Sequence, residues 1–160
     1  MRLVALSLLV LWTLALAGCQ SKAAKVKQLQ DQYNAEYPAY AKDCLDLLKE
    51  TDTRALAHIT GGGIPGNLVR VLPEHVDAVV DRSTWRPQSV FDLVQSKGRI
   101  DQQEMESTFN MGIGMMAVVA PHDVERTLAF LRGRSTDAWL VGEMISGSGQ
   151  VQMVGSYTRG

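Results

Sequence analysis

Short apolar runs alternate with helix-like segments over most of this 160-residue chain, and this alternation restricts the possible folds more than any other feature. Short runs bounded by turn residues are typical of strands, whereas longer segments with a helical apolar period are typical of helices. We therefore expect one α/β or α+β domain, with a central mixed sheet flanked by helices. The predicted strands cover residues 55–59, 77–81, 114–120, 139–145 and 151–154.

Helices are predicted over residues 88–96 and 123–132, between the strands. Pro87 suits the first turn of the former helix, and Gly98 suits its carboxyl-terminal cap. Good helix formers also dominate residues 22–50, where we expect a helix that is broken near Pro38.

Composition and charge restrict the kinds of molecule that this chain is expected to bind. Hydrophobic residues make up 46% of the chain and charged residues 21%, which is typical of a globular domain. The formal net charge of −1 provides no basic field for phosphate backbones, so we expect no nucleic-acid partner. No His, Cys and carboxylate set has the spacing of metal ligands, so no metal site is predicted. A small-molecule ligand agrees better with this composition and net charge than a nucleic acid does.

The amino end resembles a bacterial lipoprotein signal. Arg2 is followed by an apolar run, residues 3–17, that is shorter than the about 20 residues needed to span a bilayer. The run ends in Leu16-Ala17-Gly18-Cys19, which is similar to a lipobox. We predict a signal peptide over residues 1–18, lipidation of Cys19 in the cell envelope, and a tether over residues 19–39. A start codon placed too far upstream, or a fusion of reading frames, would give the same pattern in a cytoplasmic protein.

Three consecutive glycines, Gly61-Gly62-Gly63, follow the first predicted strand. Glycine adopts positive φ without steric cost and leaves backbone N–H groups uncovered, so such a loop can hold a phosphate. A flexible tight turn would have the same composition. The surrounding polar residues, His58, Thr60, Asn67 and Arg70, favour an anion site at this transition from strand to loop.

These residues carry a family resemblance. The segment His58-Ile59-Thr60-Gly61-Gly62-Gly63, followed by Asn67 and Arg70, resembles the signature of the carboxy-terminal domain of AIR synthetases (phosphoribosylformylglycinamidine cyclo-ligases). A second segment, Phe109-Asn110-Met111-Gly112-Ile113-Gly114-Met115, is also similar to the family pattern. The resemblance implies a domain over residues 40–156 and a tail over 157–160. Val69 stands where the family usually has proline, so the orientation of Arg70 is less fixed.

The resemblance also implies the site. The implied substrate and phosphate ligands are Thr60, Gly61, Gly62, Gly63, Asn67, Arg70, Asn110 and Gly112. His58 is a candidate for positioning or protonating substrate, because imidazole titrates near neutral pH, or it is a core histidine. Each remaining assignment has a structural alternative: a helix cap for Asn67, a surface ion pair for Arg70, and close packing for the second set of glycines.

The family closes the imidazole ring of aminoimidazole ribonucleotide from formylglycinamidine ribonucleotide, using ATP and magnesium held by an amino-terminal domain. We expect that domain to be missing from this chain, and therefore no cofactor within it. The resulting hypothesis is a domain that binds a phosphorylated small molecule, such as a ribonucleotide, but cannot complete ring closure alone. A separate ATP-binding domain and a second copy of the chain are the candidate partners. The alternatives are a non-catalytic, lipid-anchored envelope interaction protein, or the product of a truncated or fused cyclo-ligase gene.

Overall fold

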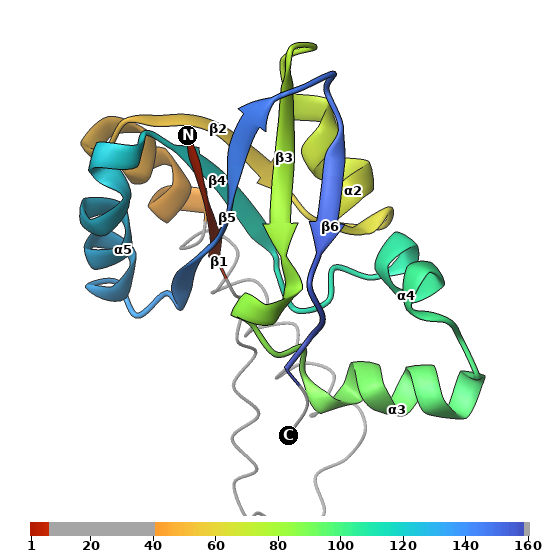
Figure 1. The fold of residues 1–160 in the computed structure, drawn as a ribbon. Helices are drawn as coiled ribbons and strands as arrows, with labels where there is room; N and C mark the ends of the chain where they lie inside the picture. Colours follow the sequence, from red (N-terminus) through yellow and green to blue (C-terminus); the bar gives the residue numbers. More distant parts are fainter. Residues whose placement is uncertain (7–40, 159–160) are drawn as a thin grey trace, which may run out of the picture.

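A six-stranded mixed sheet forms the centre of the computed structural model, which describes residues 1–6 and 41–158. The strand order is β2-β4-β1-β5-β3-β6, with β3 and β6 parallel and every other neighbouring pair antiparallel (Figure 1). The strands are β1 (Arg2–Leu6), β2 (Thr53–His58), β3 (Val76–Asp81), β4 (Met115–Val119), β5 (Ala138–Ser146) and β6 (Val151–Val154). The predicted mixed sheet and its five predicted strands are therefore confirmed, and β1 is added to them.

The helices lie on both sides of this sheet. They are α2 (Gly63–Leu68), α3 (Ser89–Gly98), α4 (Gln102–Thr108) and α5 (Val124–Arg132), and residues 41–50 are also helical. α3 and α5 confirm two of the predicted helices. α2 was not predicted, because its short sequence contains glycine and proline and has no helical pattern. At the end of α3 the left-handed residue is Arg99, with φ 52°, and not Gly98 as predicted.

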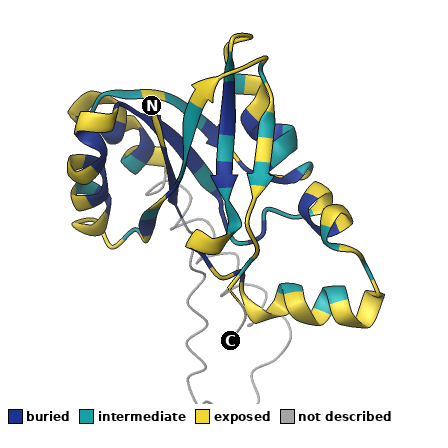
Figure 2. Ribbon diagram, viewed as in Figure 1, coloured by how far each residue is buried: buried dark blue, intermediate teal, exposed yellow. Residues whose placement is uncertain are grey.

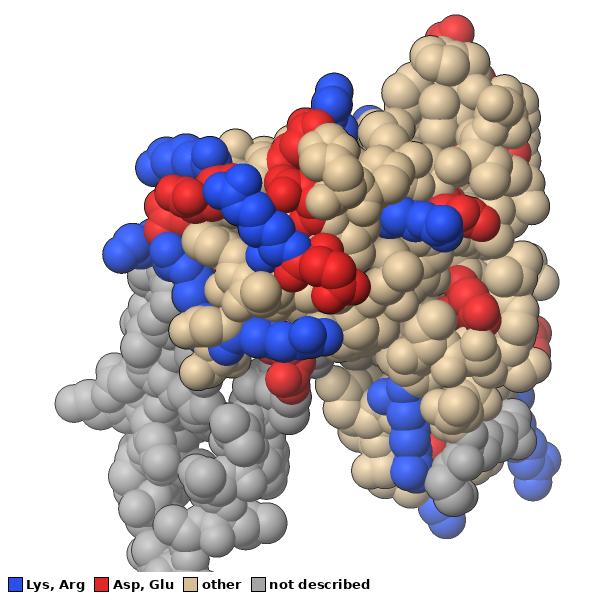
Figure 3. Space-filling model, turned by 60° about the vertical axis from the view of Figure 1, so that its left-hand side comes forward, with Lys and Arg blue, Asp and Glu red and all other residues tan. Residues whose placement is uncertain are grey.

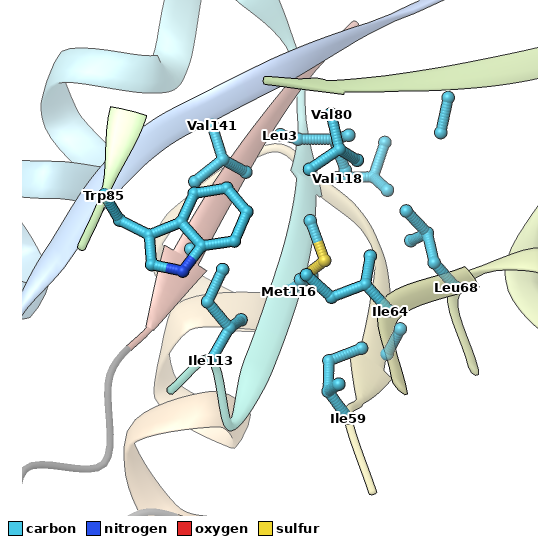
Figure 4. Packing of buried hydrophobic residues seen from close by; sticks show 13 residues of the cluster. Leu3, Ile59, Ile64, Leu68, Val80, Trp85, Ile113, Met116, Val118 and Val141 are labelled. Atoms are coloured by element: carbon cyan, nitrogen blue, oxygen red, sulfur yellow. The ribbon is translucent and has the colours of Figure 1, made fainter. Parts of the chain in front are cut away.

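Two apolar cores lie on opposite faces of the sheet. α2 covers one face, where Ile64 and Leu68 lie against Met116 and Val118 (Figure 4). α5 and the helix at 41–50 cover the other face, where Leu47, Leu128 and Leu131 belong to one cluster with the alternate residues of β1 and β4. α3 has no buried residue and lies away from both cores (Figure 2). The interior of the domain is therefore the central part of the sheet.

The central strand β1 comes from residues that the sequence assigns to a signal peptide. Leu3, Val4, Ala5 and Leu6 are completely buried, and β1 pairs with β4 on one side and β5 on the other. A continuous apolar run has the same pattern in a buried strand as in a signal segment, so the sequence pattern does not predict β1. The rest of the predicted signal, Cys19 and the tether lie outside the described residues. Among the residues that are described, no helix combines the length and apolar character needed to cross a bilayer.

Candidate functional site

The two glycine-containing motifs meet at one end of the sheet, although they are about 50 residues apart in the sequence. β2 ends at His58, and the next amide, that of Ile59, donates a hydrogen bond to the carbonyl of Gly114 over 2.9 Å. The amide of Gly114 in turn donates to the carbonyl of Leu6 over 3.1 Å. Gly114 of the second motif therefore lies between Ile59 of the first motif and Leu6, the last residue of β1.

The three glycines of the loop have different surroundings. Gly62 and Gly63 have positive φ, 96° and 60°, and Gly63 begins α2. A Cβ on Gly63 would overlap the backbone carbonyl of Glu106 in α4, so this glycine permits close packing. A Cβ on Gly61 would meet no atom within 4 Å. Of the three glycines, Gly61 is thus the one at which a side chain would enter open space.

Asn67 holds the loop in this shape. Its side chain is buried, and Nδ2 donates to the carbonyls of Gly63 at 2.8 Å and Gly61 at 3.2 Å. Its Oδ1 accepts a hydrogen bond from the Thr60 hydroxyl at 3.3 Å. Because both ends of the amide are directed at the loop itself, Asn67 is a positioning residue in this structure. Thr60 is exposed, next to Gly61.

Arg70 and His58 lie away from the open side of the loop. Arg70 is exposed in the 3-10 turn Val69–Val71, about 10 Å along the helical segment from Gly63 at 1.5 Å per residue. Arg70 makes no hydrogen bond or ion pair with another described residue. His58 is exposed, so it is not a core histidine, and its strand neighbours Ala57 and Ile59 point into the core under α2. Because side chains alternate along a strand, His58 is on the opposite face.

The second motif forms a tight loop before β4. The Asn110 carboxamide oxygen accepts from the amide of Gly112 at 3.1 Å, so this side chain also supports its own loop. Gly112 has φ 91° and lies against the side chain of Gln88. The indole N–H of Trp85 donates to the carbonyl of Met111 at 3.1 Å. The predicted ligands Asn110 and Gly112 are therefore both engaged in contacts that support this loop.

An ion pair that has no signal in the sequence fixes α4 beside the glycine loop. Arg82 follows β3, and its guanidinium binds Glu106 of α4 through two hydrogen bonds of 2.7 and 2.8 Å. Arg82 also donates to the carbonyl of Met153 in β6 at 2.6 Å, and Gln102 donates to Glu106 at 2.9 Å. The side chains are 15% and 7% exposed for Arg82 and Glu106. Since the carbonyl of the same Glu106 lies against Gly63, the pair supports the loop from behind.

The charge of Glu106 is stabilised by this arrangement. Burial alone would raise the pKa of the Glu106 carboxyl, but the hydrogen bonds from Arg82 and Gln102 and the charge of Arg82 outweigh burial and lower it. Burial and then the neighbouring Glu106 charge raise the pKa of Tyr157, which stacks edge-on against Trp85 at 5.1 Å. Glu106 is therefore ionised at neutral pH and serves as the anchor of α4.

Away from the glycine loop, charged side chains of opposite sign lie close to one another. On the face that carries α5, basic and acidic side chains lie next to one another (Figure 3). Arg134 contacts Asp43 at 2.7 Å and Asp46 at 2.9 Å. Within residues 1–6 and 41–158, no three His, Cys, Asp or Glu side chains are close enough together to hold a metal ion. The described surface thus provides hydrogen-bond donors at the glycine loop but no built cation site.

Comparison with known proteins agrees with this geometry. Residues 3–154 match the model of the family described as AIR synthase related protein, C-terminal domain. The chain belongs to this family. The matched region begins within β1 and contains both glycine motifs, so the family domain and the described sheet coincide.

Its relatives are longer proteins. A provisionally named phosphoribosylformylglycinamidine cyclo-ligase of Streptomyces fradiae is 50% identical over 105 residues, which cover 66% of this chain and 58% of that protein. The phosphoribosylformylglycinamidine cyclo-ligase of Anaeromyxobacter dehalogenans is 49% identical over 108 residues, 68% of this chain and 31% of that protein. A thiamine-monophosphate kinase structure from Stenotrophomonas maltophilia aligns with a TM-score of 0.49 and 11% identity, covering 66% of this chain and 33% of the kinase. The matched part is thus less than two thirds of either cyclo-ligase relative.

Proposed function

We propose that this AIR synthase-related domain binds the phosphate of a small molecule, in the class of ribonucleotides, on the Gly61 side of its glycine loop. The observation that carries the proposal is the combination of an open, uncovered backbone at Gly61 with a loop fixed on its other sides. Family membership supplies the class of ligand, because the relatives are named for a phosphoribosyl substrate.

Backbone amides would bind the anion. Neither Gly61 nor Gly62 donates a backbone hydrogen bond to another described residue, whereas the amide of Gly63 already donates to the carbonyl of Thr60 at 3.0 Å. Gly62 has a left-handed backbone, a conformation that can bring successive N–H groups together to bind phosphate. The Thr60 hydroxyl already donates to Asn67 Oδ1, so the amides of Gly61 and Gly62 are the donors in this proposal. Arg70 lies in the 3-10 turn that follows α2 and is not part of the proposed contact.

The region matched here is only a part of the cyclo-ligase relatives. The cyclo-ligase activity named for the relatives is carried by proteins of which this chain matches a third in the Anaeromyxobacter case. We propose that ATP and magnesium are bound outside the matched region, by a further domain, a separate chain or an assembly with a second copy. In that arrangement this domain supplies the substrate phosphate site, and His58, on the other face of the sheet, has no part in it.

Two glycine variants test the proposal directly. Gly61→Val places a side chain in the open space where the ligand would lie, and Gly66→Ala places a methyl group in open space within α2. We expect inorganic phosphate and purine ribonucleotides to raise the Tm of the parent domain and of Gly66→Ala, because ligands that bind only the folded state stabilise it. Gly61→Val should keep the parent Tm without ligand and lose the shift. The absence of a shift in the parent, or its persistence in Gly61→Val, would refute this site.

A lipid-anchored location is a separate proposal, supported by the Leu16-Ala17-Gly18-Cys19 segment. An acylated Cys19 would hold the domain at a membrane of the envelope, where it would act as an interaction protein without catalysis. Palmitate labelling of the full chain in a bacterial host measures this, with Cys19→Ala as the control. Labelling that is equal in both chains, or absent from both, would exclude the anchor.

A further inference from the structure

Beyond β6 the chain continues as residues 155–158, the strap, which pass the turn that follows β3 (Figure 1). The Arg82 guanidinium, in that turn, donates to the carbonyl of Met153 at 2.6 Å and to that of Gly155 at 3.4 Å. Gly155 has φ 68°, and a Cβ there would meet the carboxylate of Asp81. The strap is therefore held against the end of β3 in a backbone conformation that favours glycine.

The strap also contacts Trp85. The Tyr157 ring stacks edge-on against the indole, with the ring centroids 5.1 Å apart, and the Thr158 hydroxyl donates to the Trp85 carbonyl at 3.2 Å. Trp85 is buried in the core under α2, next to Ile113 (Figure 4). Its indole N–H donates to the carbonyl of Met111 in the second glycine motif at 3.1 Å. One connection thus runs from the strap through Trp85 to the second motif.

A second connection runs through Arg82. The guanidinium that binds the Gly155 carbonyl also holds the Glu106 carboxylate of α4 through two hydrogen bonds of 2.7 and 2.8 Å. The Tyr157 hydroxyl is buried beside this pair, since burial and then the Glu106 charge raise the pKa of Tyr157. The backbone carbonyl of Glu106 lies against Gly63, the last glycine of the loop and the first residue of α2. The strap therefore supports the first motif as well.

Arg82 and Trp85 both lie in the short turn that follows β3, so the strap fixes both connections at once. A binding loop keeps its geometry only when the residues behind it are locked by packing and hydrogen bonds. We propose that the strap is a positioning element that holds the two glycine motifs in their arrangement, so that its release weakens phosphate binding at Gly61 and Gly62. The effect on phosphate rests on the proposed function, whereas the positioning of the motifs is measurable without a ligand.

Variants of Tyr157 and Thr158 separate positioning from stability. Tyr157→Leu combined with Thr158→Val removes the ring pair and the hydrogen bond but keeps apolar side chains at both positions. Tyr157→Phe keeps the ring and loses only a buried hydroxyl that makes no hydrogen bond with a described residue. Leu128→Val removes a methylene group from the core under α5, so it lowers the Tm without a change at the strap. All chains are compared at a temperature at which each is folded.

Amide signals in ¹H–¹⁵N spectra of the full chain report the arrangement of the motifs without a ligand. In the double variant, we expect the signals of Gly62, Gly63 and Gly112 to move or broaden, whereas those of α5 should stay. Tyr157→Phe and Leu128→Val should leave the three glycine signals as they are in the parent. Glycine signals that stay unchanged in the double variant, or that move equally in Leu128→Val, would overturn the proposal.

Titration with inorganic phosphate, followed by the same amide signals, measures the consequence for binding. The ring pair and the hydrogen bond together correspond to about a tenfold change in the population of the competent arrangement, so the Kd of the double variant should rise about tenfold. Tyr157→Phe and Leu128→Val should bind phosphate as the parent does. An equal Kd in the double variant and the parent would overturn the role of the strap and leave the phosphate site intact. A parent that does not bind phosphate would refute the proposed function instead, and the amide signals would still decide the positioning role.

Discussion

Replacement of Glu106 by glutamine tests the anchor that holds α4 beside the glycine loop. The change keeps the side-chain shape but removes the charge that faces the Arg82 guanidinium at 2.7 and 2.8 Å. Loss of one partner from a buried ion pair costs about 3–5 kcal/mol, because the remaining charge is left without compensation. Arg82 keeps its hydrogen bond to the Met153 carbonyl and is 15% exposed, which places the loss near the lower limit, at about 3 kcal/mol.

Thermal and urea unfolding of the purified protein measure this loss. For a domain of this size, about 3 kcal/mol corresponds to a decrease in Tm of roughly 10 °C. The matched control is Glu50→Gln, since Glu50 faces Arg126 at 3.6 Å with both side chains more than half exposed. That variant should change the free energy of unfolding by less than about 1 kcal/mol. The double variant Arg82→Met with Glu106→Leu should recover much of the loss, because it leaves no unpaired charge.

The pH dependence gives a second, independent readout of the same residue. The pKa of Glu106 is lower in the folded protein than its ordinary value, so the folded state favours the ionised form. Its contribution is therefore complete above about pH 4.3, the ordinary value for glutamate, and is lost as the pH falls through the lower folded pKa. The difference in stability between the parent and Glu106→Gln should shrink in that acid range. A difference below about 0.5 kcal/mol at neutral pH would refute the anchoring role.

Two further variants test the backbone around the sheet. Gly63→Ala should cost about 3 kcal/mol or more in urea unfolding, because the methyl group meets the Glu106 carbonyl and φ is 60°, whereas Gly61→Ala should leave the stability within about 0.5 kcal/mol of the parent. Asp77→Asn should lower the Tm at neutral pH, since backbone hydrogen bonds from Gln150 and Ser148 lower the pKa of Asp77, and the difference should vanish in acid as the native carboxylate is protonated. An equal Tm difference across the acid range would contradict the role of the Asp77 charge.

Local patterns predicted most of the sheet because its strands are short, apolar and bounded by turn residues. β1 was not predicted from the sequence, because its four buried residues continue into an apolar run of the same composition, with no turn signal at Leu6. Its recognition requires the pairing partners in β4 and β5, which are distant in sequence. The short helix α2 was not predicted for a different reason. Its glycines and proline oppose helix formation, and the packing of Ile64 and Leu68 in the core stabilises the helix instead.

At the site, the sequence located the glycine loop but did not indicate the direction of its polar side chains. Asn67 has the residue type of a ligand, and only its burial shows that its amide is directed at the loop. Arg70 is near the loop in sequence, yet α2 carries it to the other end of the helical segment. The Arg82–Glu106 pair had no sequence signal, since its members lie 24 residues apart and charged residues of either sign are common on surfaces.

Contacts from three directions fix the shape of the glycine loop, so the loop would be preformed for a ligand. Asn67 binds its carbonyls from within, the Glu106 carbonyl lies against Gly63, and the hydrogen bond from Ile59 to Gly114 joins the loop to the second motif. Binding to a preformed loop requires little ordering of the backbone, so more of the interaction free energy appears as affinity. In the proposed phosphate site, the anion would therefore approach the amides of Gly61 and Gly62 from the open side at Gly61.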